Sequence, residues 1–372
     1  MINRLDLKGI EFGPSQVWEN IRLVPLIRNE ITSNLKMSKV EYDEAYSEVW
    51  TNDQKSYQSY IPFGLIASWG DSEAHLSTDS LVKKKQKKSA FDHHFRLVGK
   101  IDKNKVRILP FHLAMEAFLS TAFKRPEVRK KEFTNEFNRF GLQYRAELSW
   151  KSEWLNYVNQ SLSIFEILEN QCGVLIFISD SLASAFLLPN PEDYRYLHYT
   201  LLMDCYSDLM WHYSNVDYDV QKLKFSMNKE AIKDISSLRN AFNKANDELD
   251  KLNRVLASGL FERDLLTQEI YKLGKNRLCR FRTNFFEGKS EDHIGEMIMD
   301  SKGGVQYIKS YRLGIDQLKR GKLLQRLEEN DWDISAAAKA DELRKDQWLL
   351  NFVRAGLGDI LNANTLAEVR SF

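Results

Sequence analysis

Few residues in the sequence have a type and spacing that could do chemistry, and Asp180 is the first of them. It stands in Ser-Asp-Ser, residues 179–181, inside the apolar run GVLIFISDSLASAFLLPN of residues 173–190. A carboxylate at a strand end could serve as an acid, a base or a metal ligand, because strand ends gather ligand sites in open α/β sheets. The same residues suit an ordinary turn, in which side-chain oxygens accept hydrogen bonds from nearby backbone N–H groups. No second carboxylate or base lies at a fixed local spacing, so the turn is favoured and the catalytic residues stay unknown.

Histidine pairs give no clear metal site. His93 and His94 are adjacent, so on a strand they point to opposite faces and rarely bind one ion. Asp208 and His212 are four residues apart and would share a helix face, a spacing more typical of a hydrogen bond than of a site. We therefore expect no metal.

The cysteines and the short sequence motifs also indicate no specific chemistry. Cys172, Cys205 and Cys279 lie far apart, which argues against a disulfide framework or structural zinc and suits a reducing cytosol. The sequence contains no P-loop, GxSxG, HExxH or GxGxxG motif, and GLIASWG and SKGG are too generic to use. We expect no cofactor, and whether the chain is an enzyme stays open, with the balance against it.

The C-terminal part has the spacing of three short helices. Residues 321–357 read as GKLLQRLEENDW, DISAAAKADE and RKDQWLLNFVRAG, which is similar without a gap to the Fis-type helix-turn-helix. The apolar residues at the core positions of that motif are Trp332, Ile334, Leu343, Trp348 and Phe352. The sequence therefore predicts a tri-helical module.

DNA binding by this module is a separate question. The residues of the third helix that could contact nucleic acid are Arg344, Lys345, Gln347 and Asn351. Leu349 and Leu350, however, occupy positions where polar or basic contacts are usual. Residues 321–361 contain six basic and eight acidic residues, a net charge of −2, and phosphate neutralisation supplies most non-specific affinity. DNA is thus possible but disfavoured, and we expect both leucines to serve a protein interface.

Composition bounds the protein class. The 372 residues suffice for two or three domains, and 43% hydrophobic residues can bury a sizeable core. Lys plus Arg number 53 against 52 Asp plus Glu, which predicts no global field for nucleic acid or an anionic membrane. No stretch reaches the length of a membrane span, so we expect a cytoplasmic protein without a membrane partner.

The first 225 residues predict mixed α and β structure. Strands are expected in residues 17–27 and 60–69, a hairpin in residues 95–109 with its turn at Asp102–Asn104, and two buried strands around residues 179–181. Helices are expected in residues 110–123, in residues 154–168 and after Asn190, whose side chain can cap a helix that begins at Pro191.

A long amphipathic helix is predicted for residues 229–257. Its apolar residues recur at alternating spacings of three and four: Ile232, Ile235, Leu238, Phe242, Ala245, Leu249, Leu252 and Leu256. The stripe could pack on a neighbouring helix of the same chain or form a dimer coil, and Leu249 is an interface candidate. Residues 260–283 also have a helical pattern, so the intramolecular packing is favoured, with a basic side formed by Lys272, Lys275, Arg277, Arg280 and Arg282.

Several segments together resemble a known bacterial family. FGPSQVWENIRLVPLIR, ILPFHLAMEAFL, FEILENQCGVLIFISDSLASAFLLPNPEDYRYLHYTLLMDCY and the terminal WDISAAAKADEL look like the ARG-and-rhodanese-phosphatase-superfamily-associated proteins. The resemblance covers most of the chain outside the helical arm. It implies a role in bacterial stress or conflict systems linked to ADP-ribose or NAD metabolism, and it implies no established activity or catalytic residue.

These observations set the expected architecture and function. The fold class is α+β: a mixed-sheet N-terminal domain with packed helices over residues 1–225, then an all-helical region with an arm over 226–300 and the tri-helical module over 301–372. The function expected first is that of an accessory or interaction protein of a stress-response or defence system, with a protein partner or homo-oligomer. An enzyme acting on a nucleotide-like substrate near Asp180 and a DNA-binding regulator are the alternatives.

Overall fold

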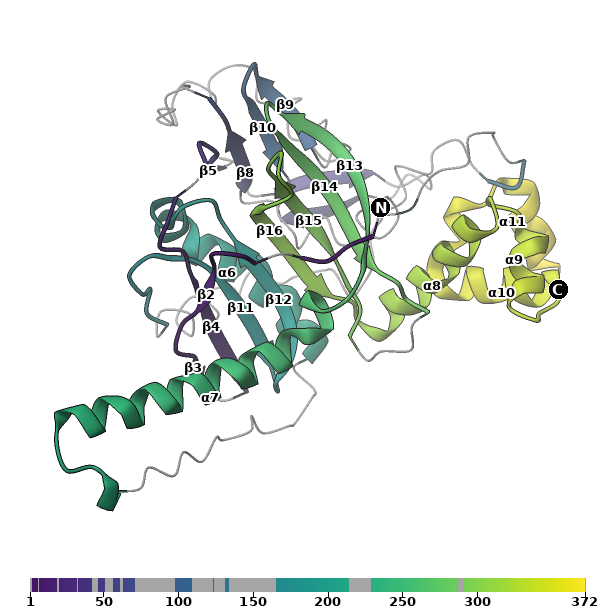
Figure 1. Ribbon diagram of the computed structural model, residues 1–372. Helices are drawn as coiled ribbons and strands as arrows, with labels where there is room; N and C mark the ends of the chain where they lie inside the picture. Colours follow the sequence, from purple (N-terminus) through teal and green to yellow (C-terminus); the bar gives the residue numbers. More distant parts are fainter. Residues whose placement is uncertain are drawn as a thin grey trace.

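A computed structural model gives the fold of the chain (Figure 1). It describes residues 2–41, 46–50, 56–60, 63–70, 98–108, 123, 131–133, 165–213, 229–286 and 291–371, apart from residues 6, 19 and 32. The sequence-predicted helix at 110–122, most of the one at 154–168, the lysine-rich run at 81–88, His93 and His94 lie outside these residues, as do the side chains of Asp208 and His212.

A ten-stranded sheet organises the molecule. Its strands follow the order β1 (Ile2–Asn3), β13 (Leu265–Leu273), β14 (Asn276–Thr283), β15 (His293–Met299), β16 (Val305–Arg312), β12 (Ser181–Leu187), β11 (Gln171–Ile178), β4 (Ile21–Ile27) and β2 (Glu11–Phe12), with β3 (Gln16–Trp18) also paired to β4. All pairings in this sheet are antiparallel, among them β1 with β13 and β12 with β16. The sheet thus joins the N-terminal strands to residues 265–312.

A smaller sheet lies beside the large one (Figure 1). It has the order β5 (Lys36–Glu41), β8 (Phe63–Ser68), β10 (Lys105–Ile108) and β9 (Val98–Asp102), and a separate hairpin pairs β6 (Tyr46–Trp50) with β7 (Ser56–Tyr60). The predicted hairpin with its turn at Asp102–Asn104 is confirmed as β9–β10.

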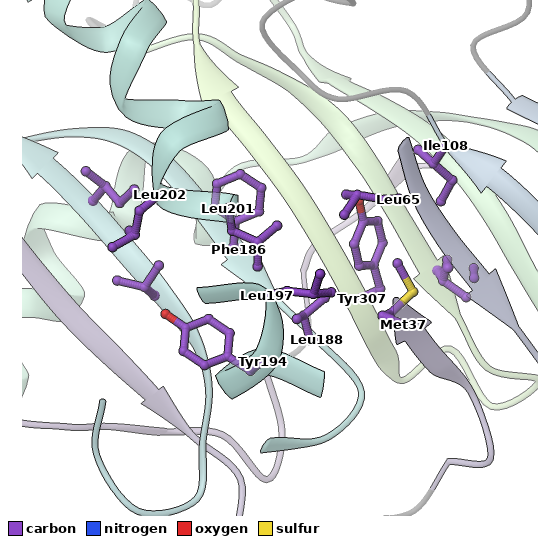
Figure 2. Close-up of a cluster of buried hydrophobic side chains, with 14 of the residues drawn as sticks. Met37, Leu65, Ile108, Phe186, Leu188, Tyr194, Leu197, Leu201, Leu202 and Tyr307 are labelled. Atoms are coloured by element: carbon purple, nitrogen blue, oxygen red, sulfur yellow. The ribbon is translucent and has the colours of Figure 1, made fainter. Parts of the chain in front are cut away.

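Helix α6 (Pro191–Tyr213) joins the two sheets. Its start is confirmed, since the Asn190 side chain accepts a hydrogen bond from the Asp193 N–H at 2.8 Å. Asp193 in turn accepts one from the backbone of Met37 in β5, at 2.6 Å. Tyr194, Leu197 and Leu201 of the helix enter a buried cluster with residues of both sheets, including Met37, Leu65, Ile108, Phe186 and Tyr307 (Figure 2).

The opposite face of the large sheet is covered by the end of α7 (Ile235–Phe261), which follows a short 3₁₀ turn at Lys229–Ala231. Asp234 and Ser237 form a reciprocal capping box that fixes where the helix begins. Ala257 and Leu260 pack into a second apolar cluster with Leu175, Ile308 and other sheet residues. The N-terminal half of α7 extends past the edge of the sheet (Figure 1).

The C-terminal helices form a third cluster. They are α8 (Ile315–Glu329), α9 (Ile334–Ala340), α10 (Lys345–Phe352), a π-helical turn (Val353–Leu357), a 3₁₀ turn (Gly358–Ile360) and α11 (Ala363–Arg370). Trp332, Ile334, Trp348 and Phe352 are buried there, as the sequence predicts, whereas Leu343 is 38% exposed. Ala337 and Ala338 allow the close helix contact, and Asp341 accepts a hydrogen bond from the Trp348 indole N–H at 2.9 Å.

The α+β class is confirmed, but the all-helical region begins only at residue 315. A helix over residues 260–283 is a wrong prediction, because β13 and β14 occupy residues 265–273 and 276–283. Arg280 and Arg282 therefore lie buried inside the sheet and form no basic helix side. The expected domain boundaries at 225 and 300 likewise divide strands that belong to one sheet. Among the described helices, none is long and apolar enough to cross a membrane.

Close backbone packing within the sheet gives a first prediction. A Cβ at Gly295 in β15 would lie 2.2 Å from the Lys309 carbonyl oxygen and 2.7 Å from the Phe281 ring. We expect Gly295→Ala to lower the free energy of unfolding by about 1–3 kcal/mol or more, as overpacking does. Gly358→Ala, which meets only ordinary contacts from 3.4 Å outward, is the control. Urea unfolding of both variants checks this, and equal stability of the two would contradict it.

Candidate functional site

A hollow of about 660 Å³ lies where the ends of the two sheets meet, and we call it the inter-sheet hollow. The smaller sheet contributes Trp69 and Gly70 after β8 and Ser33 and Asn34 before β5. The large sheet contributes its β13–β14 and β15–β16 turns. The remaining lining residues are Leu273, Gly274, Lys275, Asn276, Asp300, Ser301, Lys302 and Gln306. Its volume falls within the range of small-molecule sites.

Asp300 holds one wall of the hollow in shape. Its carboxylate accepts hydrogen bonds from the backbone N–H groups of Lys302 at 2.8 Å and Gly304 at 2.9 Å, and from the Gln306 amide at 2.9 Å. Burial opposes the charge, yet these hydrogen bonds and the nearby Lys302 ammonium hold the pKa of Asp300 below its usual value. Arg28 secures Gln306 from behind through its amide oxygen, at 3.1 Å. The wall is therefore fixed before any ligand arrives.

Trp69 forms the aromatic wall. Its backbone N–H donates to the Asn104 carbonyl at 3.1 Å, and its half-buried ring packs against the core cluster of both sheets. The ring lies against the β13–β14 turn, where Gly274 has φ 64° and a Cβ would come within 2.8 Å of the indole. Glycine thus satisfies both the turn and the close approach of the ring.

Two lysines make the hollow mildly cationic. Lys275 in the β13–β14 turn and Lys302 in the β15–β16 turn are exposed, and neither forms an ion pair with another described residue. Asp300, the one acidic residue of the lining, has its carboxylate occupied by the contacts above. An indole face, two ammonium groups and several amides suit a planar, anionic ligand rich in hydrogen-bond acceptors.

Asp180 lies elsewhere, in the two-residue turn between β11 and β12. Ser179 and Asp180 both have positive φ, 48° and 58°, as a tight hairpin turn requires. The Asp180 carboxylate accepts a hydrogen bond from Arg22 Nε at 2.9 Å, and this pair is largely buried. The favoured turn interpretation and the two predicted buried strands are confirmed.

Asp180 also lines a second hollow of about 550 Å³, the turn pocket. Glu262 and Glu291 line it too, with Val255, Leu256, Ser258 and Gly259 of α7 as its wall. Burial raises the pKa of Glu291, although Arg312 lies 3.9 Å away and opposes the shift. A raised pKa makes this carboxyl easier to protonate than an exposed glutamate. The lining includes no histidine or cysteine, and no His, Cys, Asp and Glu group among the described residues is arranged to hold a metal ion.

Other buried charges serve the fold. Glu296 sits between Lys309 Nζ at 3.7 Å and Arg280 Nε at 4.0 Å on the neighbouring strands, and burial raises its pKa. Arg263 Nη1 donates to Asp292 Oδ1 at 2.8 Å, which ties the end of α7 to the start of β15. Neither group borders a described hollow.

The polar candidates of the C-terminal module are exposed. Lys345, Gln347 and Asn351 lie on the surface of α10, and Arg344 caps its N-terminus. The Arg344 guanidinium binds Asp346 through Nε at 3.0 Å and through a second nitrogen, so its charge is partly neutralised within the helix. The structure gathers these four residues in one short segment, beside an acidic neighbour.

The two leucines of the module differ in burial. Leu349 is 1% exposed and Leu350 is half-buried, and both pack in the C-terminal apolar cluster. Leu349 shares a helix face with Phe352, three residues on, and is closed to solvent, whereas a partner contact through Leu350 stays a prediction. Leu249, the third interface candidate, is half-buried on α7.

Sequence reasoning missed the inter-sheet hollow. Its main parts come from GLIASWG and SKGG, two segments more than 200 residues apart that are too generic to interpret alone. Only the pairing of distant strands brings Trp69 and Lys302 to one place. A tryptophan followed by glycine at a strand end was the single local signal.

His293 gives a prediction about pH. Its ring is fully buried and has no hydrogen-bond partner among the described residues, and burial, with Arg312 and Arg263 adding to the effect, lowers the pKa of His293 to about 3. The unfolded chain binds this proton below about pH 6.5, so folding stability is complete above that pH and falls as pH drops toward 3. The slope is up to about 1.4 kcal/mol per pH unit. We expect His293→Leu to flatten this decline in urea unfolding between pH 7 and 4. Equal slopes in both proteins would contradict it.

The exposed residues of α10 give a prediction about DNA. We expect the full chain to bind duplex DNA more weakly than micromolar at physiological salt, because the module is net negative and Arg344 is engaged by Asp346. Arg344→Ala with Lys345→Ala should change little in a fluorescence anisotropy titration. Sub-micromolar affinity with a steep salt dependence that the double variant loses would contradict this.

Comparison with known proteins places the chain in a family. No curated protein and no solved structure matches it significantly. The family model ARPP-2 matches residues 5–274, which include the smaller sheet, α6, α7 and both turns that carry Asp180 and Gly274. Residues 275–372, with Lys302 and the C-terminal helices, lie outside the match. Because the match spans well over half of the chain, this protein belongs to the ARPP-2 family.

Proposed function

We propose that the chain is an accessory protein of a bacterial stress-response or defence system that recognises a nucleotide-like anion of the ADP-ribose or NAD class in the cytoplasm. The binding site is the inter-sheet hollow. The observation that carries the proposal is that the Trp69 indole and the exposed side chains of Lys275 and Lys302 line one cavity.

Each part of the hollow has a role in binding. The base stacks on Trp69, a contact that contributes about 1–3 kcal/mol per base in nucleic-acid complexes. The phosphates lie toward Lys275 and Lys302, whose charges also steer the anion into the cavity. Ribose hydroxyls find partners in Asn34, Asn276 and the Ser301 hydroxyl.

Recognition is favoured over turnover at this place. The lining of the hollow includes no cysteine, histidine or glutamate, and the one aspartate, Asp300, is held ionised by three donors. A general acid or base needs a pKa near the working pH, which these contacts prevent. The hollow therefore suits binding a ligand without converting it. A protein partner would then respond to the bound state.

An enzymatic alternative rests on Glu291. Its raised pKa and its position beside Asp180 in the turn pocket would suit proton transfer to a substrate bound there. Slow conversion of ADP-ribose or NAD by the protein, lost in Glu291→Gln and kept in Lys302→Glu, would move the function to this pocket.

The proposal predicts ligand binding that depends on charge and on the indole. In isothermal titration calorimetry we expect ADP-ribose to bind with micromolar affinity, and Lys302→Glu to weaken it at least 10-fold, more strongly at low salt. Lys339→Glu makes the same charge change at an exposed position of α9 and serves as the control. Trp69→Ala should weaken adenosine and ADP-ribose binding alike, because both stack.

Two results would contradict the proposal. One is the absence of binding of ADP-ribose, NAD and adenosine monophosphate at millimolar concentration by a folded protein. The other is binding that Lys302→Glu and Lys275→Glu leave unchanged. Since both lysines are exposed, these variants keep the fold and remain informative if Trp69→Ala is unstable.

A further inference from the structure

The N-terminal half of α7 exposes an apolar stripe. Ile235 is 70% exposed and Phe242 50%, whereas Ala257 and Leu260 at the other end of the helix are buried against the sheet. The stripe continues through Leu238, Ala245, Leu249 and Leu252 at alternating spacings of three and four. An exposed apolar surface of this length marks an interaction site in most proteins.

The described residues leave Ile235, Leu238 and Phe242 exposed, whereas Ala245, Leu249 and Leu252 farther along the stripe are half-buried. The sequence-predicted partner helix at residues 260–283 does not exist, because these residues form β13 and β14. The helix leaves the sheet edge and extends away from the C-terminal helices (Figure 1).

We propose that a second copy of this chain covers it, with the two α7 helices packed antiparallel. With Ile235 placed opposite Leu252 of the partner subunit, Leu238 meets Leu249 of the partner subunit and Phe242 meets Ala245 of the partner subunit. Every apolar residue of the stripe is then in a layer, and the large phenylalanine faces a small alanine. The contact is isologous and closes at two copies.

Charge selects this orientation. Residues 235–244 carry Arg239 and Lys244 and no acidic residue, whereas residues 245–250 carry Asp247, Glu248 and Asp250 and no basic residue. In the antiparallel pair, residues 235–244 of one copy, with a net charge of +2, lie opposite residues 243–252 of the other, where Lys244 and Lys251 beside the three acidic residues leave a net charge of −1. A parallel pair would place like charges and like helix dipoles side by side.

The oligomeric state of the full chain tests the proposal. We expect a dimer in sedimentation velocity at micromolar concentration, and Phe242→Asp to raise its dissociation constant by roughly 100-fold or more, because a charge enters the seam twice. The control is Val255→Asp, on the same helix and 68% exposed but outside the stripe. It should stay dimeric. Both variants should keep the melting temperature of the monomer fold, since both sites are exposed.

Orientation is tested by spin labels at Ser236→Cys and Asn243→Cys, with the unsubstituted protein as control for native thiols. An antiparallel pair separates the two labels at 236 by about 22 Å along the axis and brings those at 243 level. Equal label distances at the two positions, a monomer at every concentration, or a dimer that Phe242→Asp leaves intact would each overturn the proposal. It is independent of the ligand site, so its failure leaves the proposed function standing.

Discussion

The central strands of the ten-stranded sheet are buried on both faces, and this constraint sets the position of the layers that cover them. Strands β11, β12, β15 and β16 are buried along almost their whole length. One face is closed by α6 and the smaller sheet, and the other by the end of α7 and the N-terminal segment that contains Leu5 and Ile10. The hydrophobic effect fixes these layers, since each covered strand removes large apolar side chains from water.

The two features with functional meaning arise where this covering ends. At one end of the sheet the hairpin turns of β13–β14 and β15–β16 reach past the smaller sheet, and the space between them is the inter-sheet hollow. On the opposite face α7 is longer than the sheet it covers, so its apolar stripe continues into solvent. The proposed binding cavity and the proposed self-association surface are formed by different residues and lie on different parts of the molecule.

Local signals in the sequence predicted local structure well. The turn at Asp102–Asn104, the cap at Asn190 and the break at residues 179–181 each depend on a few adjacent residues, and each is confirmed. The helix predicted over residues 272–282 is wrong, because in a sequence the arginines of a strand look like the solvated side of a helix. The ion pairs that bury them are visible only in the structure. Arg282 bonds to Gln325 at 2.9 Å and also to Glu328, both on α8, a contact between residues more than 40 positions apart. The exposure of Leu349 is also hard to predict, because a rotation of one residue about the helix axis decides whether a leucine side chain faces solvent or the buried cluster. The candidate ligand site, built from residues 33 to 306, depends on strand pairing throughout and has no local signature.

The proposed function requires a nucleotide-like ligand to bind in the inter-sheet hollow. A crystal structure of the full chain grown with ADP-ribose measures this most directly. We expect ligand density in the inter-sheet hollow, with the adenine on the Trp69 indole and the phosphates within reach of Lys275 and Lys302. Density in the turn pocket beside Asp180 and Glu291, or an empty hollow at millimolar ligand, would contradict it.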